Sequence, residues 1–278
     1  MAHFFNSLSY SNLSLYCKNK GKWYERYVLK QEPGAKGMSM LVGAMVHLLL
    51  EKMFKEKISY WELNEKLLSN ETMNEIFTKV SEEYSIDSTI DIHLSHVRQA
   101  MVFYVNYIYN NFNQFKNIEH IEFKSSASIE GVPFPLLSIA DLIVTGENGD
   151  LEIIDHKVVS KFSAESQPKL AYYIQGWFMY QTVQASFPGA SINAVIFNEI
   201  KKTKNQKDSP QVRAFRIEAK ELRDIHATML RMINYMAKEI KGEPLLLSEG
   251  EYVPNFFSFS EQENLYCLEQ FKEVNSIK

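Results

Sequence analysis

The sequence predicts an α/β fold in which a mixed central β-sheet is flanked by helices and follows a helical N-terminal half. Residues 1–117 place their apolar side chains at helical spacing. At Ile118 the pattern changes to short, strand-like segments that are separated by glycine-containing turns. Between Asp150 and Ile200 a strand, a helix and a strand follow one another, which implies a parallel crossover within the sheet. Since neither an internal repeat nor a linker interrupts the chain, we expect residues 1–278 to form one domain.

Helices are expected through the N-terminal half. The segment GMSMLVGAMVHLLLEKMFKE, which starts at Gly37, is apolar around most of its circumference and predicts a helix buried against several neighbours. Asn70 is followed by acidic residues, as at an N-cap, so a second helix is expected from there to about Tyr84. A third and longer helix is expected over residues 90–115.

The remaining elements alternate between strands and helices. Three strand-like segments come first, and the last two are joined by the turn GENGD, which predicts a β-hairpin. The expected strands lie within residues 118–131, 134–146, 150–160, 192–200 and 211–218, and the expected helices within residues 166–186 and 219–240.

Composition excludes several classes of protein. The chain has 278 residues, of which 45% are hydrophobic and 23% charged, and this balance is not that of a disordered or collagen-like chain. Two cysteines, Cys17 and Cys267, cannot build a disulfide framework. The N-terminus lacks the features of a signal peptide, and the most apolar stretch, residues 41–50, is too short to span a bilayer. We therefore expect a cytoplasmic protein without membrane contact.

The chemistry is expected where two strands end in charged residues. Asp155 and Lys157 are two residues apart on a strand, so their side chains point to the same face. Asp141 follows apolar residues on the preceding strand of the hairpin, and antiparallel pairing would bring its carboxylate close to that of Asp155. Two such carboxylates suit Mg²⁺ or Mn²⁺, and a nearby lysine could orient or deprotonate a metal-bound water. This combination can hydrolyse a phosphodiester.

The pattern of an acidic residue two positions before a lysine has little value by itself. It occurs five times, whereas composition alone would give about three occurrences. Only Asp155 with Lys157 combines a buried type of strand, an upstream hairpin aspartate and a following helix. The four pairs set aside are Glu122 with Lys124, Glu199 with Lys201, Glu218 with Lys220 and Glu239 with Lys241.

Four segments, in order, resemble the PD-(D/E)XK nucleases, in the branch of the RecB nuclease domain, lambda-type phage exonucleases and CRISPR-associated exonucleases. SYSNLSLYCKNKGKWYERYV, from Ser9, resembles the opening helix of that branch, and GAMVH resembles its glycine–histidine motif. SIADLIV with GDLEIIDHK resembles the aspartate hairpin and the D-x-K strand, and AYYIQGWFMY resembles the helix that follows. The resemblance covers residues 9–200 and implies a restriction-endonuclease-like core, at residues 118–241, between the helical part and a C-terminal tail at residues 242–278.

The resemblance also implies a metal site and a catalytic lysine. Asp141 and Asp155 would bind Mg²⁺, with Mn²⁺ as the alternative, and Lys157 would be catalytic. His47 would be the third side-chain ligand, and the backbone carbonyl of His156 a further one. An alternative for a lone histidine on an apolar helix is a role in the core.

Other residues would support this site or contact the substrate. Glu122 would be an outer-shell group. Gln175 and Tyr180 would contact nucleic acid, although the branch has tyrosine four residues after the glutamine and this chain has Met179 there. With two cysteines instead of four, no iron–sulfur cluster is expected.

A basic strip offers a grip on the nucleic acid backbone. Residues 201–216 carry four lysines and two arginines against one aspartate, although such a run is usually a solvated loop. Lys201, Lys202 and Lys204 are the contacts expected from it. A second basic group near the N-terminus consists of Lys18, Lys20, Lys22 and Arg26.

The resulting hypothesis is a Mg²⁺-dependent DNA exonuclease that acts on linear ends in recombination, repair or phage DNA processing. Its setting would be the cytoplasm, or the host cytoplasm for a phage-encoded enzyme. A phage or host recombination protein as partner and an oligomeric state both stay open. The alternatives are a structure-specific DNA endonuclease and a non-catalytic DNA-binding module on the same fold.

Overall fold

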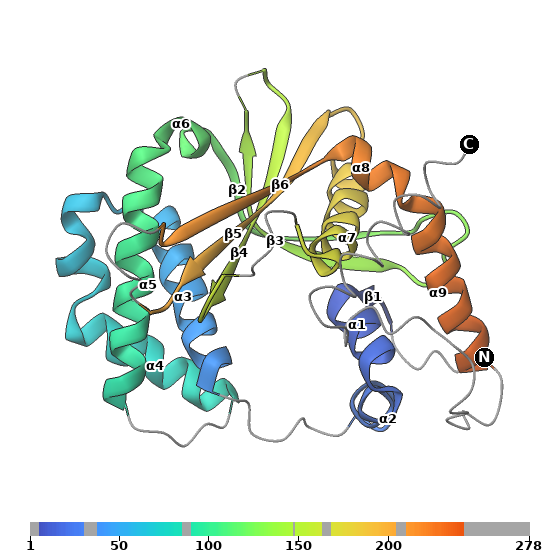
Figure 1. The fold of residues 1–278 in the computed structure, drawn as a ribbon, viewed down its shortest axis with the longest axis horizontal. Coiled ribbons are helices and arrows are strands. Elements are labelled where there is room, and N and C mark those ends of the chain that lie inside the picture. Colours follow the sequence, from blue (N-terminus) through green and yellow to red (C-terminus); the bar gives the residue numbers. More distant parts are fainter. Residues whose placement is uncertain are drawn as a thin grey trace.

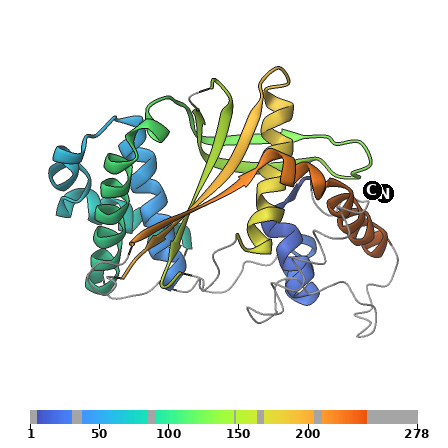
Figure 2. The same cartoon turned by 45° about the horizontal axis from the view of Figure 1, so that its top comes forward.

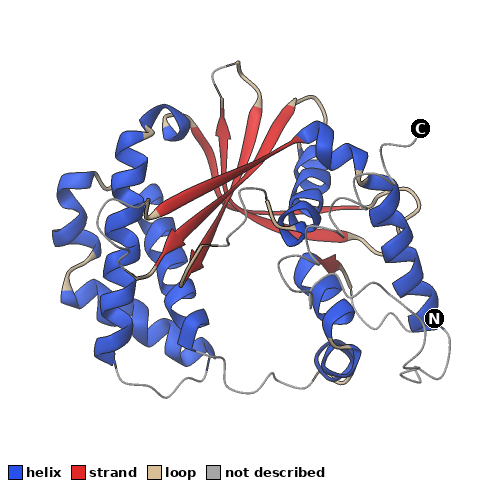
Figure 3. Cartoon of the chain, in the orientation of Figure 1, coloured by secondary structure: helices blue, strands red, loops and turns tan. Residues whose placement is uncertain are grey.

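The computed structural model describes residues 6–30, 38–84, 90–146, 148–162, 168–203 and 210–241. A mixed six-stranded sheet runs through the middle of the molecule, and helices cover both of its faces (Figures 1 and 3). The predicted fold class is therefore confirmed.

The longest antiparallel pair of the sheet is formed by β2 and β3. The order of the sheet is β1-β3-β4-β5-β6, and β2 pairs with the other edge of β3. Strand β4 runs parallel to β5, and helix α7 connects them, as the crossover prediction required. The strands are β1 (Leu8–Ser9), β2 (Ile118–Ala127), β3 (Leu136–Thr145), β4 (Leu151–Val159), β5 (Ile192–Lys201) and β6 (Val212–Glu218).

The helices form two groups, one on each face of the sheet. Figures 1 and 2 show α3, α4 and α5 on one side and α1, α7, α8 and α9 on the other. The first group and its neighbouring short helices are α3 (Met38–Lys55), η2 (Tyr60–Glu62), η3 (Leu63–Leu67), α4 (Asn70–Tyr84), α5 (Ile90–Asn110) and α6 (Phe112–Phe115). The second group is α1 (Tyr10–Lys18), α2 (Lys20–Trp23), η1 (Tyr24–Val28), α7 (Leu170–Ser186), α8 (Ala219–Asp224) and α9 (His226–Lys241).

Each face of the sheet has its own hydrophobic core. Alternate residues of β4 and β5 point to opposite faces, so Ile153 and Phe197 pack with α7 whereas Ile154 and Ile196 pack with α3 and α5. Strands buried on both faces explain why these segments are almost continuously apolar in sequence.

The sheet divides in the middle of β3. Strand β1 pairs with Leu136 and Leu137, and β4 pairs with residues 142–145 of the same edge. Beyond Ile154, β4 leaves β3 and continues beside β5 alone. Asp141 is the β3 residue that directly precedes this paired segment, so it lies where the two strands separate.

The structure corrects several expected boundaries. Leu8 and Ser9 form a strand within the part that was expected to be helical. Ser69, not Asn70, caps α4, because its hydroxyl accepts a hydrogen bond from the backbone N–H of Thr72 at 3.2 Å. The expected helix at residues 90–115 ends at Asn110 and is followed by α6, and that at residues 219–240 is interrupted at Ile225. Residues 242–278 lie outside the described residues.

Within the described ranges, no helix has both the length and the apolar character that a membrane crossing requires.

Candidate active site

The separation of β3 and β4 brings two buried acidic residues to one place. The flanking register, Leu142 opposite Ile154, puts Asp141 and Asp155 next to each other at the end of the paired segment. Their relative exposures are 9% and 3%. The predicted approach of these two residues is thus found in the structure.

A chain of buried side chains holds the Asp141 carboxylate in place. The backbone N–H of His156 donates to Asp141 Oδ2 at 2.6 Å, and His156 Nδ1 lies 3.0 Å from the same oxygen. Because a carboxylate accepts, Nδ1 carries the proton, which leaves Nε2 to accept from the Tyr104 hydroxyl at 2.5 Å. Asn198 Nδ2 in turn donates to that hydroxyl at 3.1 Å. Only the backbone carbonyl of His156 was expected to take part in the site, and the bond from its ring to Asp141 was missed.

His47 approaches Asp141 from the other layer. Helix α3 places its Nδ1 at 3.4 Å from Asp141 Oδ2. Burial lowers the pKa of His47, but the Asp141 charge outweighs burial and raises that pKa to about 9. The pKa of Asp141 is held well below its usual range, because His47 and the hydrogen bonds from His156 and His47 outweigh its own burial. The protonated His47 ring and the Asp141 carboxylate therefore form an ion pair.

Glu122 belongs to the same cluster. The β2–β3 register on either side of Glu122 places it opposite Asp141. Its backbone φ is 51°, a value that residues other than glycine rarely adopt. Ligating atoms of His47, Glu122 and Asp141 all lie within 4.8 Å of one another. Burial and the neighbouring Asp141 raise the pKa of Glu122 to about 7. Glu122 was expected in the outer shell, whereas the structure places it directly beside the other candidate ligands.

Asp155 is held by two residues on the α7 side of the sheet. Lys157 Nζ lies 2.5 Å from its Oδ2, and Gln175 Nε2 donates to its Oδ1 at 2.9 Å. Although burial disfavours the charged ammonium, Asp155 and Asp141 raise the pKa of Lys157. Gln175 was expected to contact nucleic acid, but the structure shows its amide oriented toward Asp155.

A buried glutamate lies on the neighbouring strand. Glu199 is the register partner of Lys157 and is fully buried. Its Oε1 accepts hydrogen bonds from Lys169 Nζ at 2.8 Å and from the Tyr172 hydroxyl at 2.6 Å. The side chain of Tyr10, at the start of α1, is within electrostatic range of Lys157 and Asp155. These residues close the α7 side of the site.

The donor set fits a hard divalent cation. Two ligands of one Mg²⁺ ion lie at most about 4.2 Å apart, so the cluster of His47, Glu122 and Asp141 would have to contract by only about half an ångström. Asp155 Oδ2 is buried and accepts no hydrogen bond from the described residues, its contact being the ion pair with Lys157. A bound cation would share this oxygen with the Lys157 ammonium. The carboxylate ligands suit Mg²⁺ or Mn²⁺, whereas the His47 imidazole is of a ligand type that transition metals prefer.

The residues that were expected to grip nucleic acid are mostly not exposed. Tyr180 is 8% exposed and its hydroxyl accepts from Arg223, so it is part of the core. Lys201 and Lys202 are also 8% exposed, and Lys201 Nζ lies over the Phe162 ring. These positions correct the expectation of an open basic strip. Lys204 lies outside the described residues.

The N-terminal basic group is more accessible. Lys18, Lys22 and Arg26 are exposed along α1, α2 and η1, and Lys20 is half-buried with its Nζ over the Tyr16 ring. This group lies on the same side of the sheet as α7 (Figure 1).

Glu199 was missed although it carried a sequence signal, and Glu122 was given a more distant place than the structure shows. Glu122 and Glu199 each precede a lysine by two positions on a strand, and both pairs were set aside because the pattern is common. Their position on strands next to that of Asp155 and Lys157 could have singled them out. No signal in the sequence marks Tyr104 or Asn198.

Comparisons with known proteins bear on the family and the fold of the chain. A model of the PD-(D/E)XK nuclease superfamily matches residues 7–251. No curated protein matches the sequence. A crystal structure from Eubacterium rectale, named "Putative exonuclease", superposes with a TM-score of 0.56 at 12% identity, covering 84% of this chain and 81% of its own. The crystal structure of SSO0001 covers 84% and 87% at 15% identity, but its TM-score of 0.33 supports no argument.

Proposed function

The chain belongs to the PD-(D/E)XK nuclease superfamily, and from this premise we propose that it is a Mg²⁺-dependent DNA exonuclease of the RecB-like, lambda-type phage branch. In this proposal residues 1–278 are one nuclease domain, and the enzyme degrades linear DNA from its ends during recombination, repair or phage DNA processing. The observation that carries the proposal is the meeting of Asp141, Asp155 and Lys157 where β3 and β4 separate.

The cation would be held between the two layers of the molecule. His47, Glu122 and Asp141 would each supply a side-chain ligand. Asp155 would add its Oδ2 atom, and the backbone carbonyl of His156 would be the last ligand from the protein. When bound, such a cation polarises a phosphoryl oxygen and lowers the pKa of a water molecule. The hydrogen bonds from the backbone N–H and the ring of His156 fix the orientation in which the Asp141 carboxylate would meet the cation.

Lys157 would act as a positive charge. Its raised pKa keeps the ammonium protonated near neutral pH, so it cannot accept a proton there. A protonated Lys157 can hydrogen-bond a phosphate oxygen and stabilise the charge that develops as the P–O3′ bond breaks. Water supplies the new P–O bond, and the products are a 3′ hydroxyl and a 5′ phosphate.

The first experiment compares DNA forms. Wild type, Lys157→Ala and the control Lys220→Ala, which removes an exposed lysine on α8, are incubated with linear duplex, linear single-stranded and closed circular DNA, in Mg²⁺ or EDTA. We expect degradation of linear DNA only, only with Mg²⁺, and a loss of about a hundredfold or more in Lys157→Ala.

Each other result points elsewhere. Cleavage of circles would favour the endonuclease. Binding of DNA without cleavage in Mg²⁺ or Mn²⁺ would favour the non-catalytic module. Full activity of Lys157→Ala would remove the catalytic assignment of this lysine.

A further inference from the structure

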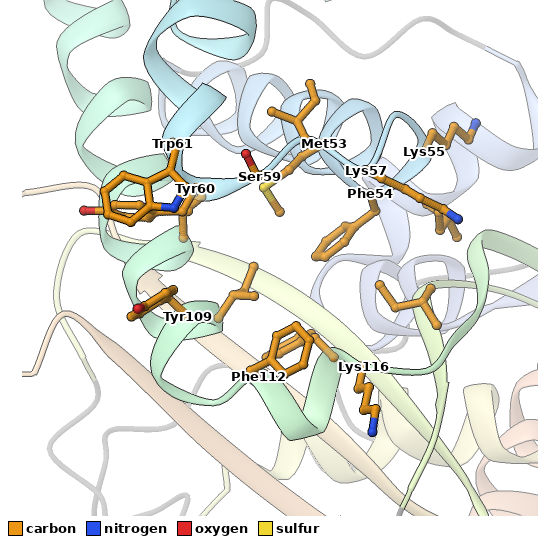
Figure 4. Close-up of a pocket in the computed structure, with 16 residues that line it drawn as sticks. Met53, Phe54, Lys55, Lys57, Ser59, Tyr60, Trp61, Tyr109, Phe112 and Lys116 are labelled. Atoms are coloured by element: carbon orange, nitrogen blue, oxygen red, sulfur yellow. The ribbon is translucent and has the colours of Figure 1, made fainter.

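A second feature of the surface has no role in the site described above. A hollow of about 710 Å³ opens between the end of α3, η2, the end of α5, α6 and the start of β2. Figure 4 shows the aromatic side chains and lysines of this aromatic hollow arranged around its centre. Its size is that of pockets that bind small molecules or parts of larger ligands.

The rings of this hollow are exposed to an unusual degree. Trp61 is 79% exposed, Tyr109 63%, Phe112 62% and Tyr60 38%. Tyr60 contacts Trp61 at 5.1 Å and Tyr109 at 5.6 Å between ring centroids, so the rings form a continuous group. Exposed aromatic side chains that gather in one place mark a binding surface more often than a part of the core.

The charge of the hollow is positive although that of the protein is −4. Its lining includes Lys55, Lys57 and Lys116 but no acidic residue. Lys55 is paired with Glu51, whereas Lys57 and Lys116 have no ion pair within the described part of the chain. Two acidic residues near the hollow, Glu56 and Glu62, form salt bridges with lysines that do not line it, Lys52 and Lys66.

The hollow lies next to the candidate active site, although its lining includes none of the site residues. Helix α3 carries His47 and, eight residues or about 12 Å further along, Lys55. Strand β2 presents Ile121 to the hollow, and the next residue, Glu122, belongs to the metal cluster. Phe54 lines the hollow and stacks on the His156 ring at 6.4 Å.

We propose that the aromatic hollow binds unpaired bases of a single-stranded nucleic acid segment next to the scissile phosphate. This inference rests on the proposed function and names the form of its substrate. Aromatic faces bind bases by stacking, which base pairing would prevent, and the lysines at the rim match the phosphates between the bases. The substrate is therefore single-stranded, or has an end that separates before it is cut.

Trp61 provides a direct readout. The sequence has three tryptophans, and Trp23 and Trp177 are 1% and 0% exposed, so Trp61 is the exposed one. Lys157→Ala protein in EDTA is titrated with oligo(dT) while tryptophan emission is recorded. We expect saturable quenching that disappears in Trp61→Phe, and no quenching by a relaxed, closed circular duplex, in which every base is paired.

Binding variants test the same contacts without relying on fluorescence. Trp61→Ala should weaken oligo(dT) binding, measured by anisotropy of a labelled strand, by about fivefold or more. The double variant Lys57→Ala/Lys116→Ala should reduce the slope of log K against log salt by about 1.4. The matched controls, Tyr235→Ala for the ring and Lys220→Ala/Lys238→Ala for the charge, change exposed residues of α8 and α9 and should leave both quantities unchanged.

The outcomes separate the two proposals. Tight binding of oligo(dT) without a change in Trp61 emission, or equal quenching by the closed duplex, would overturn this inference and leave the nuclease proposal intact. A change of Trp61 emission with protein concentration alone would mean that a second copy covers the hollow, which also overturns it. If the wild type neither binds nor cleaves any DNA, both proposals fail.

Discussion

Glu122 combines two unfavourable features at one residue. Its φ of 51° is strained for a side chain with a Cβ atom, and its carboxylate lies close to that of Asp141. Its raised pKa, to about 7, is due first to burial and then to Asp141. Backbone strain and repulsion between like charges are often found at ligand-binding sites, where the bound ligand offsets their cost. A cation between the two carboxylates would do so.

This argument predicts opposite effects of Glu122→Gln without and with metal. A carboxyl group whose pKa is raised in the folded state from 4.5 to about 7 costs stability as the pH rises through this range. At pH 8 in EDTA we therefore expect the variant to be more stable than wild type by about 1 kcal/mol, since water screens part of the effect. In Mg²⁺ the order should reverse, because the variant has lost a ligand.

Chemical denaturation at pH 4 and pH 8, in EDTA and in Mg²⁺, checks this prediction. At pH 4 both proteins carry a neutral side chain at position 122, so their difference in free energy of unfolding should largely disappear. Equal free energies of unfolding of wild type and Glu122→Gln at pH 8 in EDTA would show that neither burial nor Asp141 disfavours the charged Glu122 carboxylate.

At the residue scale, the sequence was informative where charge interrupts an apolar strand. Asp141, Asp155 and Lys157 could be predicted to meet because strand alternation and hairpin pairing follow from the sequence. The position of Glu122 depends on a left-handed backbone within a strand, which no pattern of residue types predicts. Lys201 is likewise buried by the packing of its own strand end, which a count of charges does not reveal.

Helix α7 is the element that fixes Gln175 beside Asp155. It packs against both the sheet and α8, and Gly176 faces Leu222 of α8 and Phe197 and Val195 of β5. A Cβ atom there would be 3.3 Å from Leu222 Cδ2 and 3.6 Å from the Phe197 ring. A larger side chain would force the helix away from the strand that carries Phe197.

Two substitutions at Gly176 should therefore differ sharply. Gly176→Ala meets only the flexible end of Leu222 and gains helix propensity, so its free energy of unfolding should stay within about 1 kcal/mol of wild type. Gly176→Leu overpacks the interface and should lose about 1–3 kcal/mol. Urea denaturation of both variants measures this difference. A neutral Gly176→Leu would contradict the close approach.

The order and type of the long elements followed from the sequence, whereas their ends did not. The strands of the sheet from β2 to β6 and the helices α3, α4 and α7 have strong periodicity or apolar runs, and they were predicted within a few residues. The interruption at Ile225 was missed because residues on both sides favour helix. Strand β1 consists of two residues, too few to show any alternation, and exists through its pairing with Leu136 and Leu137 of β3.

At the scale of the whole molecule, the candidate site connects two layers that have separate cores. His47 comes from α3, whose core lies on one face, whereas Gln175 and the Asp155 side chain belong to the α7 face. Asp141 lies between them on β3. A cation bound by both layers would stabilise the folded chain in proportion to its binding energy, since the unfolded chain lacks the site.

This arrangement predicts that Mg²⁺ raises the melting temperature and that the increase grows with pH. At a free Mg²⁺ concentration one hundred times the dissociation constant, binding adds about 2.7 kcal/mol to the free energy of unfolding. His47 must lose its proton to act as a ligand, and its raised pKa of about 9 in the metal-free protein means that the proton is present at pH 7. The same raised pKa stabilises the metal-free protein fully below pH 6.5, and this contribution is lost as the pH rises to 9.

Both effects act in one direction, so the difference in melting temperature between Mg²⁺ and EDTA should increase from pH 6.5 to pH 9. Differential scanning calorimetry at four pH values in this range measures it. In His47→Gln the pH dependence should shrink to the part due to Glu122, whose pKa of about 7 leaves one proton to be released on metal binding, and in Asp141→Asn the metal effect itself should be greatly reduced. A Mg²⁺ effect of equal size at every pH in wild type would show that His47 is not a ligand and that the two layers are not joined through it.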